Sequence, residues 1–271
     1  MADALSTATV PTDVATAWLR RWDTQQERYV ADREERFAVL CDVVEAALAD
    51  VPEPVVLDLG CGPGSLAARL QDRLPSATIV GIDADPLLLG LARSRYGAPI
   101  RWVDADLTGT DWPEKVPSTV HAAVSTTALH WLPGDRLAAL YRTLGALLAP
   151  GGVLVNGDHL GIADERLEAL ALTVRDRRAA RAGVLANEEW GPWWDAVHAD
   201  PHLADLAAER ARRIAARERT AGETVSADGA QHRHGNGLTV DEHTELLRAA
   251  GFTSVAPVWQ VGDDHVLAAL K

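Results

Sequence analysis

Cysteine and long apolar runs are both scarce in this 271-residue sequence. Its 2 cysteines, Cys41 and Cys61, are too few for a disulfide framework, which is typical of proteins from a reducing compartment. No uninterrupted apolar stretch approaches the ~20 residues of a membrane span. The first residues also lack the basic start and apolar block of a secretory signal. We therefore expect a cytoplasmic, globular protein without a membrane partner.

Basic residues are in deficit as well. The chain has 26 lysines and arginines against 39 aspartates and glutamates, a formal net charge of −13. Because nucleic acid attracts positive charge, this balance argues against a nucleic-acid partner and favours a small molecule. The nearest pattern to a metal site is His232–Arg233–His234, which has no neighbouring cluster of cysteines or carboxylates. We therefore expect no metal.

Between residues 55 and 155, short apolar runs rich in β-branched residues alternate with helical stretches. The expected strands are residues 55–57, 78–82, 100–103, 120–124 and 153–155, with helices between them. Such alternation is typical of crossover units in a parallel sheet with helices on both faces. The sequence therefore predicts an α/β fold.

The flanking segments divide the chain into four predicted parts. Residues 1–50 are N-terminal helices, with helix expected throughout 12–49, and residues 51–159 form the core. Residues 160–238 are a helical cap insertion, with helices over 163–182 and 202–219, a tryptophan-rich turn between them and a surface loop over 221–238. Residues 239–271 give a helix and an antiparallel hairpin of strands 253–260 and 265–270, which distinguishes this fold from a plain dinucleotide-binding fold.

Two features of the cap leave alternatives open. Trp190, Trp193 and Trp194 either form an aromatic wall over a pocket or pack the cap helices together. The arginine runs of the cap helices either form a solvated face or supply one or two residues that bind an anionic acceptor.

A glycine-rich turn follows the first expected strand. Glycines at 60, 62 and 64 allow backbone conformations that other residues avoid, and the turn leads into a helix N-terminus that favours a carboxylate or phosphate. Their spacing differs from the Gly-x-Gly-x-x-Gly of pyrophosphate binders. Asp58 also places negative charge at the strand end, which suits a cationic ammonium or sulfonium ligand better than a dinucleotide.

At these residues the sequence resembles the class I S-adenosylmethionine-dependent methyltransferases. Their successive motifs match residues 58–64, Asp83, residues 104–107 and residues 148–154, and the match covers about residues 27–158 with the terminal helix and hairpin. The resemblance implies a Rossmann-like seven-stranded mixed sheet of order 3-2-1-4-5-7-6, with the last strand antiparallel. It also implies S-adenosyl-L-methionine as the cofactor.

The resemblance assigns roles within a cofactor site. Asp83 would accept hydrogen bonds from the ribose hydroxyls, and Asp106, or second Asp104, would accept from the adenine amino group. Asp58 would face the methionine ammonium above the glycine turn. The whole implied cofactor set is Tyr29, Arg36, Asp58, Gly60, Cys61, Gly62, Gly64, Asp83, Ala84, Asp104, Ala105, Asp106, Leu107 and Thr126.

The methyl acceptor is expected beside the segment after the fourth strand. The Asn/Asp-Pro-Pro-Tyr/Phe pattern of nucleic-acid amino-methyltransferases is absent there, and His130–Trp131 is similar to the Gln/His-Trp pair of trans-aconitate-like carboxyl methyltransferases. The implied catalytic residues are His130, Trp131, His159 and Tyr29. A homodimer is left open.

The acceptor's chemistry decides whether a base is needed. A carboxylate is ionised at neutral pH and needs only positioning, whereas a hydroxyl or amine needs a base that His130 or His159 could supply. We favour O-methylation of a small molecule, with a carboxylate before a hydroxyl. The alternatives are N- or C-methylation, a non-catalytic S-adenosylmethionine-binding regulator, and a nicotinamide oxidoreductase, which the glycine spacing disfavours.

Overall fold

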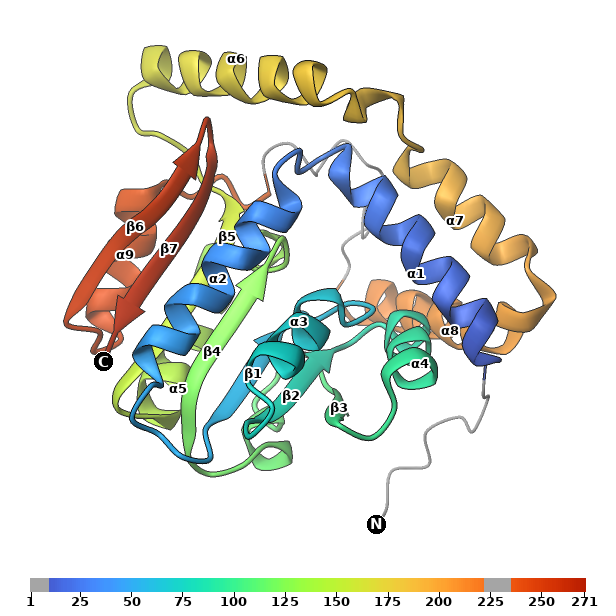
Figure 1. Cartoon of the computed structure of the whole chain (residues 1–271), viewed down its shortest axis with the longest axis horizontal. Coiled ribbons are helices and arrows are strands. Elements are labelled where there is room, and N and C mark those ends of the chain that lie inside the picture. The colour runs from blue at the N-terminus through green and yellow to red at the C-terminus, as the bar shows by residue number, and fades with distance from the viewer. Residues whose placement is uncertain (1–9, 222–234) are drawn as a thin grey trace.

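A central sheet of seven strands organises the computed structural model, which describes residues 10–221 and 235–271 (Figure 1). Its order is β3-β2-β1-β4-β5-β7-β6, and β7 is antiparallel to both of its neighbours. The predicted sheet order is confirmed. The strands are β1 (Val55–Leu59), β2 (Thr78–Asp83), β3 (Ile100–Asp104), β4 (Val120–Thr126), β5 (Leu148–His159), β6 (Ser254–Val261) and β7 (Asp264–Leu270).

The parallel strands bring their carboxyl ends to one edge of the sheet. Asp83 at the end of β2 lies opposite Asp104 at the end of β3, and Leu59 at the end of β1 lies opposite Ser125 of β4. The residues that follow each strand therefore meet at this edge, which is where open α/β sheets bind ligands.

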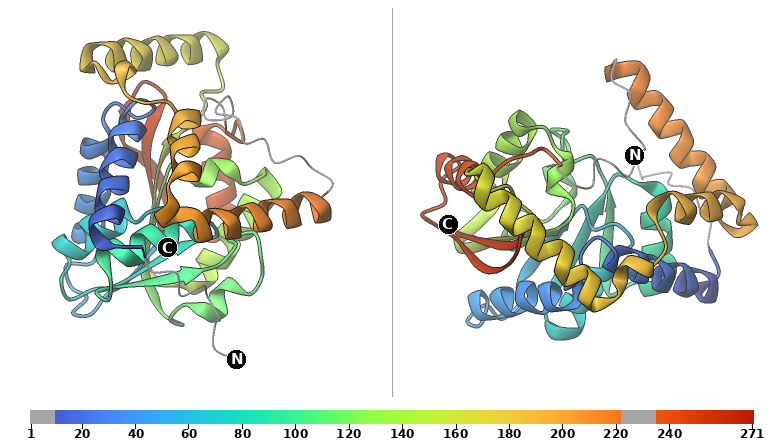
Figure 2. Two further views of the ribbon diagram at one scale, coloured as in Figure 1. Left: turned by 90° about the vertical axis from the view of Figure 1, so that its right-hand side faces the viewer. Right: turned by 90° about the horizontal axis from the view of Figure 1, so that it is seen from above.

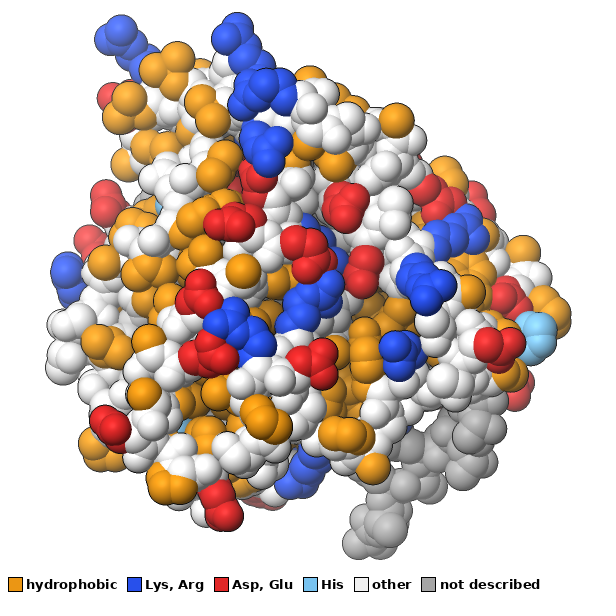
Figure 3. Space-filling model, viewed as in Figure 1, with side chains coloured by type: hydrophobic (Ala, Val, Ile, Leu, Met, Phe, Trp, Pro, Cys, Tyr) orange, Lys and Arg blue, Asp and Glu red, His pale blue; other side chains and the backbone are white. Residues whose placement is uncertain are grey.

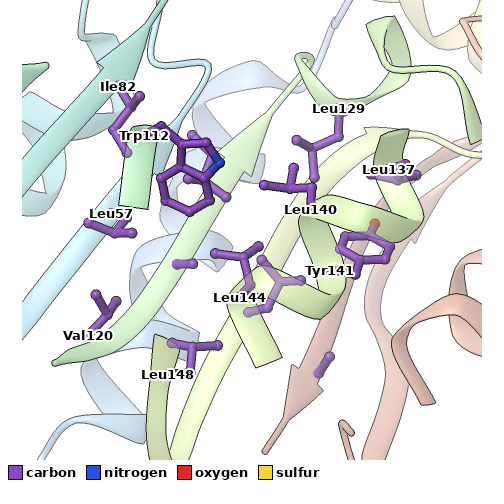
Figure 4. Packing of buried hydrophobic residues seen from close by; sticks show 14 of the residues in the cluster. Leu57, Ile82, Trp112, Val120, Leu129, Leu137, Leu140, Tyr141, Leu144 and Leu148 are labelled. Carbon is purple, nitrogen blue, oxygen red and sulfur yellow. The ribbon is translucent and has the colours of Figure 1, made fainter. Parts of the chain in front are cut away.

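Two apolar layers hold helices against the two faces of the sheet. On one face, Phe37, Leu40 and Val44 of α2 pack against β1, β4 and β5. On the other, Leu140 and Leu144 of α5 pack with Trp112 over the same strands (Figure 4). The α-helices are α1 (Thr12–Glu27), α2 (Arg33–Ala47), α3 (Ser65–Arg73), α4 (Pro86–Tyr96), α5 (Gly134–Leu147), α6 (Glu165–Ala182), α7 (Trp190–Ala199), α8 (Ala204–Ala221) and α9 (Val240–Ala249). The short 3₁₀ helices are η1 (Trp112–Lys115), η2 (Leu129–Trp131), η3 (Val184–Ala186) and η4 (Pro201–Leu203).

The N-terminal region departs from the sequence-based expectation. Helix was expected throughout residues 12–49, but the chain leaves the helix after Glu27 and re-enters it at Arg33. Val30 in the break is only 1% exposed, and the Tyr29 hydroxyl accepts a hydrogen bond from the Trp190 backbone N–H at 3.0 Å. Burial of Val30 and the hydrogen bond to the Tyr29 hydroxyl offset the helical hydrogen bonds that the break loses.

The segment predicted as a cap contains α6, α7 and α8. The helices expected over 163–182 and 202–219 are confirmed as α6 and α8, whereas the tryptophan-rich segment expected as a turn is the helix α7. Trp193 is fully buried, with its ring centroid 5.5 Å from Trp18 and 5.0 Å from Trp22 of α1. Packing of Trp193 therefore fixes α7 to α1.

The cap helices extend past the sheet at two places. Figure 2 shows α6 across one end of the molecule and the C-terminal half of α8 projecting beyond the strands. Most of the loop expected over 221–238, including His232 and His234, lies outside the described residues.

Opposite charges are interspersed on the face that carries α1 and α2 (Figure 3). Ion pairs here join α3 to α2, with Arg69 2.5 Å from Glu34 and Arg73 2.7 Å from Asp42. Across residues 10–221 and 235–271, every helix is too short or too polar to cross a membrane.

Candidate functional site

A cleft of about 370 Å³ opens at the carboxyl edge of the sheet. Its floor is the glycine turn after β1 with the segments that follow β2, β3 and β4. Its walls come from the break between α1 and α2, from Trp190 at the start of α7, and from α8. Segments that are far apart in the sequence therefore enclose one site.

The glycine turn forms the floor beneath the cleft. Gly60 and Gly62 have φ values of 67° and 53°, in the left-handed region that glycine tolerates best. A Cβ atom on Gly60 would lie 2.5 Å from the Cβ atom of Ala128, so the turn also needs glycine for its close approach to the loop after β4. The Gly62 N–H donates to the Asp83 carboxylate at 2.7 Å, which ties the turn to β2.

Asp83 lines the cleft at the end of β2. One carboxylate oxygen accepts from the Gly62 N–H and the other from the Asp85 N–H at 2.8 Å. Burial raises the pKa of Asp83 to about 6, although the Asp85 N–H opposes the rise. Each oxygen keeps lone-pair capacity for a further donor, so the geometry fits a pair of ribose hydroxyls.

Asp58 lies behind the turn and does not line the cleft. It is fully buried, and neither carboxylate oxygen has a hydrogen-bond partner among the residues that the structure describes. Burial raises its pKa to about 7; the nearby backbone N–H of Ala67 opposes the rise, and the charge of Asp83 adds to it. An uncompensated buried carboxylate is costly, so a cationic group bound at the turn would stabilise it. The residues present therefore fit an adenosyl sulfonium that carries an ammonium group.

The residues after β3 separate into two roles. Ala105, Asp106 and Leu107 line the cleft, whereas Asp104 does not. Asp104 instead accepts from Arg213 of α8 at 2.8 Å. Of the two carboxylates that the sequence offered for adenine, the structure places Asp106 at the cleft.

Helix α8 supplies arginines to the cleft wall. Arg210, Arg213 and Arg217 all line it. They pair with the carboxylates of Asp85 at 2.6 Å, Asp104 at 2.8 Å and Asp106 at 3.1 Å. These arginines are therefore neither a purely solvated face nor unpaired anion ligands, because each is matched to a carboxylate of the core.

The α1–α2 break places Tyr29 at the cleft but leaves Arg36 outside it. Arg36 is fully buried and donates to Asp264 at 2.7 Å and to Thr126 at 2.9 Å. Arg33, one helical turn earlier, lines the cleft instead and donates to Asp23 at 2.7 Å. Sequence reasoning missed Arg33, because two arginines three positions apart carry no signal of which one faces a ligand.

The other residues that the resemblance assigned to the cofactor fall into two groups: some line the cleft, and Gly64 packs behind it. Cys61, Ala84 and Thr126 line the cleft, whereas Gly64 does not. Gly64 precedes α3 with a φ of 86° and packs against Trp102. Burial raises the pKa of the Cys61 thiol well above its ordinary value, so this cysteine is a packing residue and not a nucleophile.

The segment after β4 forms the wall expected to meet the acceptor. Thr127 has a φ of 48°, which is rare for a β-branched residue and marks backbone strain at the cleft. His130 is 9% exposed and Trp131 is 44% exposed, with their ring centroids 4.9 Å apart. Both line the cleft, so the predicted acceptor pair lies beside the glycine turn.

His159 also lines the cleft, and each of its ring nitrogens faces a protein oxygen. Nε2 lies 3.2 Å from the Tyr29 carbonyl oxygen, and Nδ1 lies 3.3 Å from the Asp263 carboxylate. Burial alone would lower the pKa of His159, but the hydrogen bond to Asp263 and the charges of Asp264 and Asp263 raise it above its ordinary value. His159 therefore fastens the α1–α2 break to the turn before β7.

Metal chemistry has no evident donor set here. In the described part of the chain, no three or more histidine, cysteine or carboxylate side chains are grouped to hold an ion.

The sheet order, its antiparallel β7 and the glycine turn beside Asp83 define the class I S-adenosylmethionine-dependent methyltransferase fold. Comparison with known families agrees, because residues 56–152 match a methyltransferase domain. The chain carries a class I S-adenosylmethionine-dependent methyltransferase domain, and S-adenosylmethionine is the cofactor of that class.

Curated relatives are similar over part of their length. An uncharacterized methyltransferase of Mycobacterium tuberculosis is 43% identical over 114 residues, which are 42% of this chain and 54% of the relative. A trans-aconitate 2-methyltransferase of Methylobacterium radiotolerans is 33% identical over 177 residues, which are 65% of this chain and 59% of the relative. The chain thus spans little more than half the length of these relatives.

Solved structures share the fold. Human N-acetylserotonin methyltransferase in complex with S-adenosylmethionine superposes with a TM-score of 0.52 at 17% identity, covering 91% of this chain and 56% of that one. A putative O-methyltransferase from Nostoc punctiforme gives a TM-score of 0.52 at 15% identity, covering 92% and 60%.

Proposed function

We propose that the protein transfers the methyl group of S-adenosylmethionine to an oxygen atom of a small-molecule acceptor. The observation that carries this proposal is one continuous cleft that joins the glycine turn and Asp83 to the wall of His130 and Trp131. A cofactor held at the first pair would present its reactive end to the second pair. S-adenosylmethionine would supply the methyl group as an electrophile.

The chain's own contribution is positioning and exclusion of water. Asp83 and the glycine turn hold the nucleoside side, while Tyr29 and the arginines of α8 close the cleft above it. His130 and Trp131 would orient the acceptor oxygen in line with the methyl group. Such positioning is worth several powers of ten in rate without any covalent step on the protein.

A carboxylate is the favoured acceptor. A carboxylate is already ionised at neutral pH, so the reaction needs no base. Relatives at about one third identity that are named trans-aconitate 2-methyltransferases support this choice. In its protonated form, His130 would donate a hydrogen bond to such an acceptor.

A hydroxyl is the second candidate acceptor. The geometry that favours it is the pairing of His130 Nδ1 with the Asp158 carboxylate at 2.7 Å, because a neutral imidazole held in this way accepts a proton at its other nitrogen.

The test is a screen with methyl-deuterated S-adenosylmethionine and a panel of small carboxylic acids, phenols, alcohols and amines, read by mass spectrometry. We expect a labelled ester or ether together with S-adenosylhomocysteine. Products labelled only at nitrogen or carbon would overturn the oxygen assignment. Tight cofactor binding without turnover on any acceptor would favour a regulator. Asp83→Asn is the matched variant, since it weakens cofactor binding without touching the acceptor wall.

A further inference from the structure

Helix α6 crosses one end of the molecule and is fastened to the rest of the chain along one side (Figure 2). On that side Ala171 is buried, and Arg175 donates at 2.9 Å to Asp263 in the turn before β7. Arg178 pairs with Asp32, which precedes α2. These contacts fix the position of α6 through its inner side and leave its outer side to another contact.

The outer side of α6 carries an apolar stripe. Leu167, Leu170 and Val174 are 55%, 63% and 46% exposed. Their spacing of three and four positions places them on one face of the helix. Figure 3 shows hydrophobic and basic side chains at the end of the molecule where α6 lies. Grouped apolar side chains of this exposure are typical of an interaction surface, whereas scattered ones are not.

The two ends of α6 carry opposite charges. Glu165 lies in the first turn, and Arg177 and Arg181 continue the apolar stripe toward the C-terminal end. Within residues 10–221 and 235–271, the ion pairs of α6 involve Arg175 and Arg178 instead. Glu165 precedes Arg177 by 12 positions, or about 18 Å along the helix, which is too far for the two to pair in one chain.

An antiparallel second copy of α6 would cover the apolar stripe. In a two-fold pair centred between Leu170 and Val174, Leu170 of each copy faces Val174 of the other. In the same register Leu167 faces the aliphatic stem of Arg177, which packs well against apolar surface. The exposed stripe is therefore complementary to itself.

The same arrangement matches the charges. Arg177 and Arg181 of each copy lie at the end of the facing helix that carries Glu165, and the opposed helix dipoles add to this attraction. A parallel pair would place like charges together, which disfavours association. The charge pattern thus selects the antiparallel arrangement and favours a second copy of this chain over an unrelated partner.

We propose that α6 is a homodimer interface, in which the outer sides of two copies pack antiparallel about a two-fold axis. Such a contact uses the same patch on both subunits, so it needs a surface that complements itself. The stripe and the opposite charges of α6 provide one. The inference goes beyond the methyl-transfer reaction, since the residues that line the cleft come from other elements than α6.

The contact is small, because the 18 residues of α6 span about 27 Å. A single pair of helices of this length lies at the lower end of specific interfaces. We therefore expect a weak dimer, with a Kd of about 1–100 µM.

Sedimentation equilibrium of the full chain, from about 1 to 300 µM, measures this association. We expect monomers at the low end of the range and dimers at the high end. Leu170→Glu should raise the Kd on the order of 100-fold, because a two-fold interface contains the substitution twice. The melting temperature of the variant shows that it is folded.

Leu270→Glu is the matched control. Leu270 is 44% exposed and is the last residue of β7, which leads away from α6 toward the C-terminus (Figure 1). This variant should keep the Kd of the unaltered chain.

Charge reversal tests the orientation of the two helices. The double variant Arg177→Glu/Arg181→Glu and the variant Glu165→Arg each place like charges opposite one another, so each alone should dimerise about tenfold more weakly. An equimolar mixture should recover most of the affinity. In the mixed dimer the reversed charges of one variant face those of the other, and the unaltered ends also face each other.

Three results would overturn the proposal. They are a monomer at every concentration, a dimer that Leu170→Glu leaves intact, and a mixture of the charge variants that associates no more tightly than either variant alone. The screen for methyl transfer is read separately, so each of these results leaves the proposed function standing.

Discussion

Replacing Asp83 by asparagine should weaken cofactor binding by about two powers of ten. In the proposed complex the carboxylate accepts from two ribose hydroxyls, and a hydrogen bond to a charged acceptor is worth roughly 1.5–3 kcal/mol. Asparagine keeps one acceptor oxygen and no charge, so we expect a loss of about 3 kcal/mol, or roughly 100-fold in Kd. The amide also cannot accept from both the Gly62 and the Asp85 N–H groups, which the carboxylate does at 2.7 Å and 2.8 Å.

Calorimetric titration with S-adenosylhomocysteine measures this loss. The affinity of the unaltered protein should also weaken as the pH falls through about 6, because the pKa of Asp83 is raised to that value and only the ionised form accepts from both hydroxyls. Asp111→Asn is the matched control, since its side chain is 64% exposed and does not line the cleft. A change in Kd smaller than about threefold for Asp83→Asn, with the fold intact, would refute the ribose contact.

Other substitutions test the turn and the acceptor wall. The pKa of Asp58 rises from 3.8 to about 7 on folding, so the folded state holds a proton that the unfolded state releases, and stability is lost as the pH rises between those values. Asp58→Asn should therefore raise the melting temperature at pH 8 much more than at pH 5, with a gain on the order of 4 kcal/mol as the upper limit; equal gains at both values would contradict the assignment. Gly64→Ala should destabilise the fold more than Gly97→Ala in chemical denaturation. Both glycines have positive φ, but a Cβ on Gly64 would lie 2.4 Å from Trp102, whereas one on Gly97 would meet nothing within 4 Å. Equal losses would show that Trp102 moves freely. Trp131→Ala should lower kcat far more than cofactor affinity, and parallel losses in the two measurements would argue against an acceptor role.

The strands of the core were predictable because the sheet is buried on both faces. Runs such as residues 78–82 contain little besides buried apolar side chains, and the helix start at Asp85–Pro86 marks the end of this run. The antiparallel hairpin was predictable from the turn at Gly262, whose φ is 66°. These local signals were enough to place the strands and turns. The order of the strands in the sheet came from the resemblance to the class I methyltransferases.

The cleft residues contributed by distant segments were not predictable in the same way. The pairing of Arg213 with Asp104 joins residues 109 positions apart, and nothing local distinguishes Arg213 from its neighbouring arginines. The same holds for Arg33 and Arg36, whose different environments follow from the break at Tyr29. Such contacts depend on how α8 and α2 pack, which composition and spacing do not encode.

Asp158 could have been identified from the sequence as a candidate functional residue. The fifth strand was expected over residues 153–155, but it continues to His159. Asn156 and Asp158 are therefore polar residues inside a buried strand, at 2% and 1% exposure. Buried polar residues in a strand at the carboxyl edge are candidates for a functional site, because burial must be offset by specific partners.

The most direct test of the account is a crystal structure of the full chain with S-adenosylhomocysteine. We expect the ribose hydroxyls within hydrogen-bond distance of the Asp83 carboxylate, the adenine beside Leu107 and the sulfur atom turned toward His130 and Trp131. A ligand bound elsewhere, or an unrelated nucleotide in contact with Asp83 and the glycine turn, would contradict it.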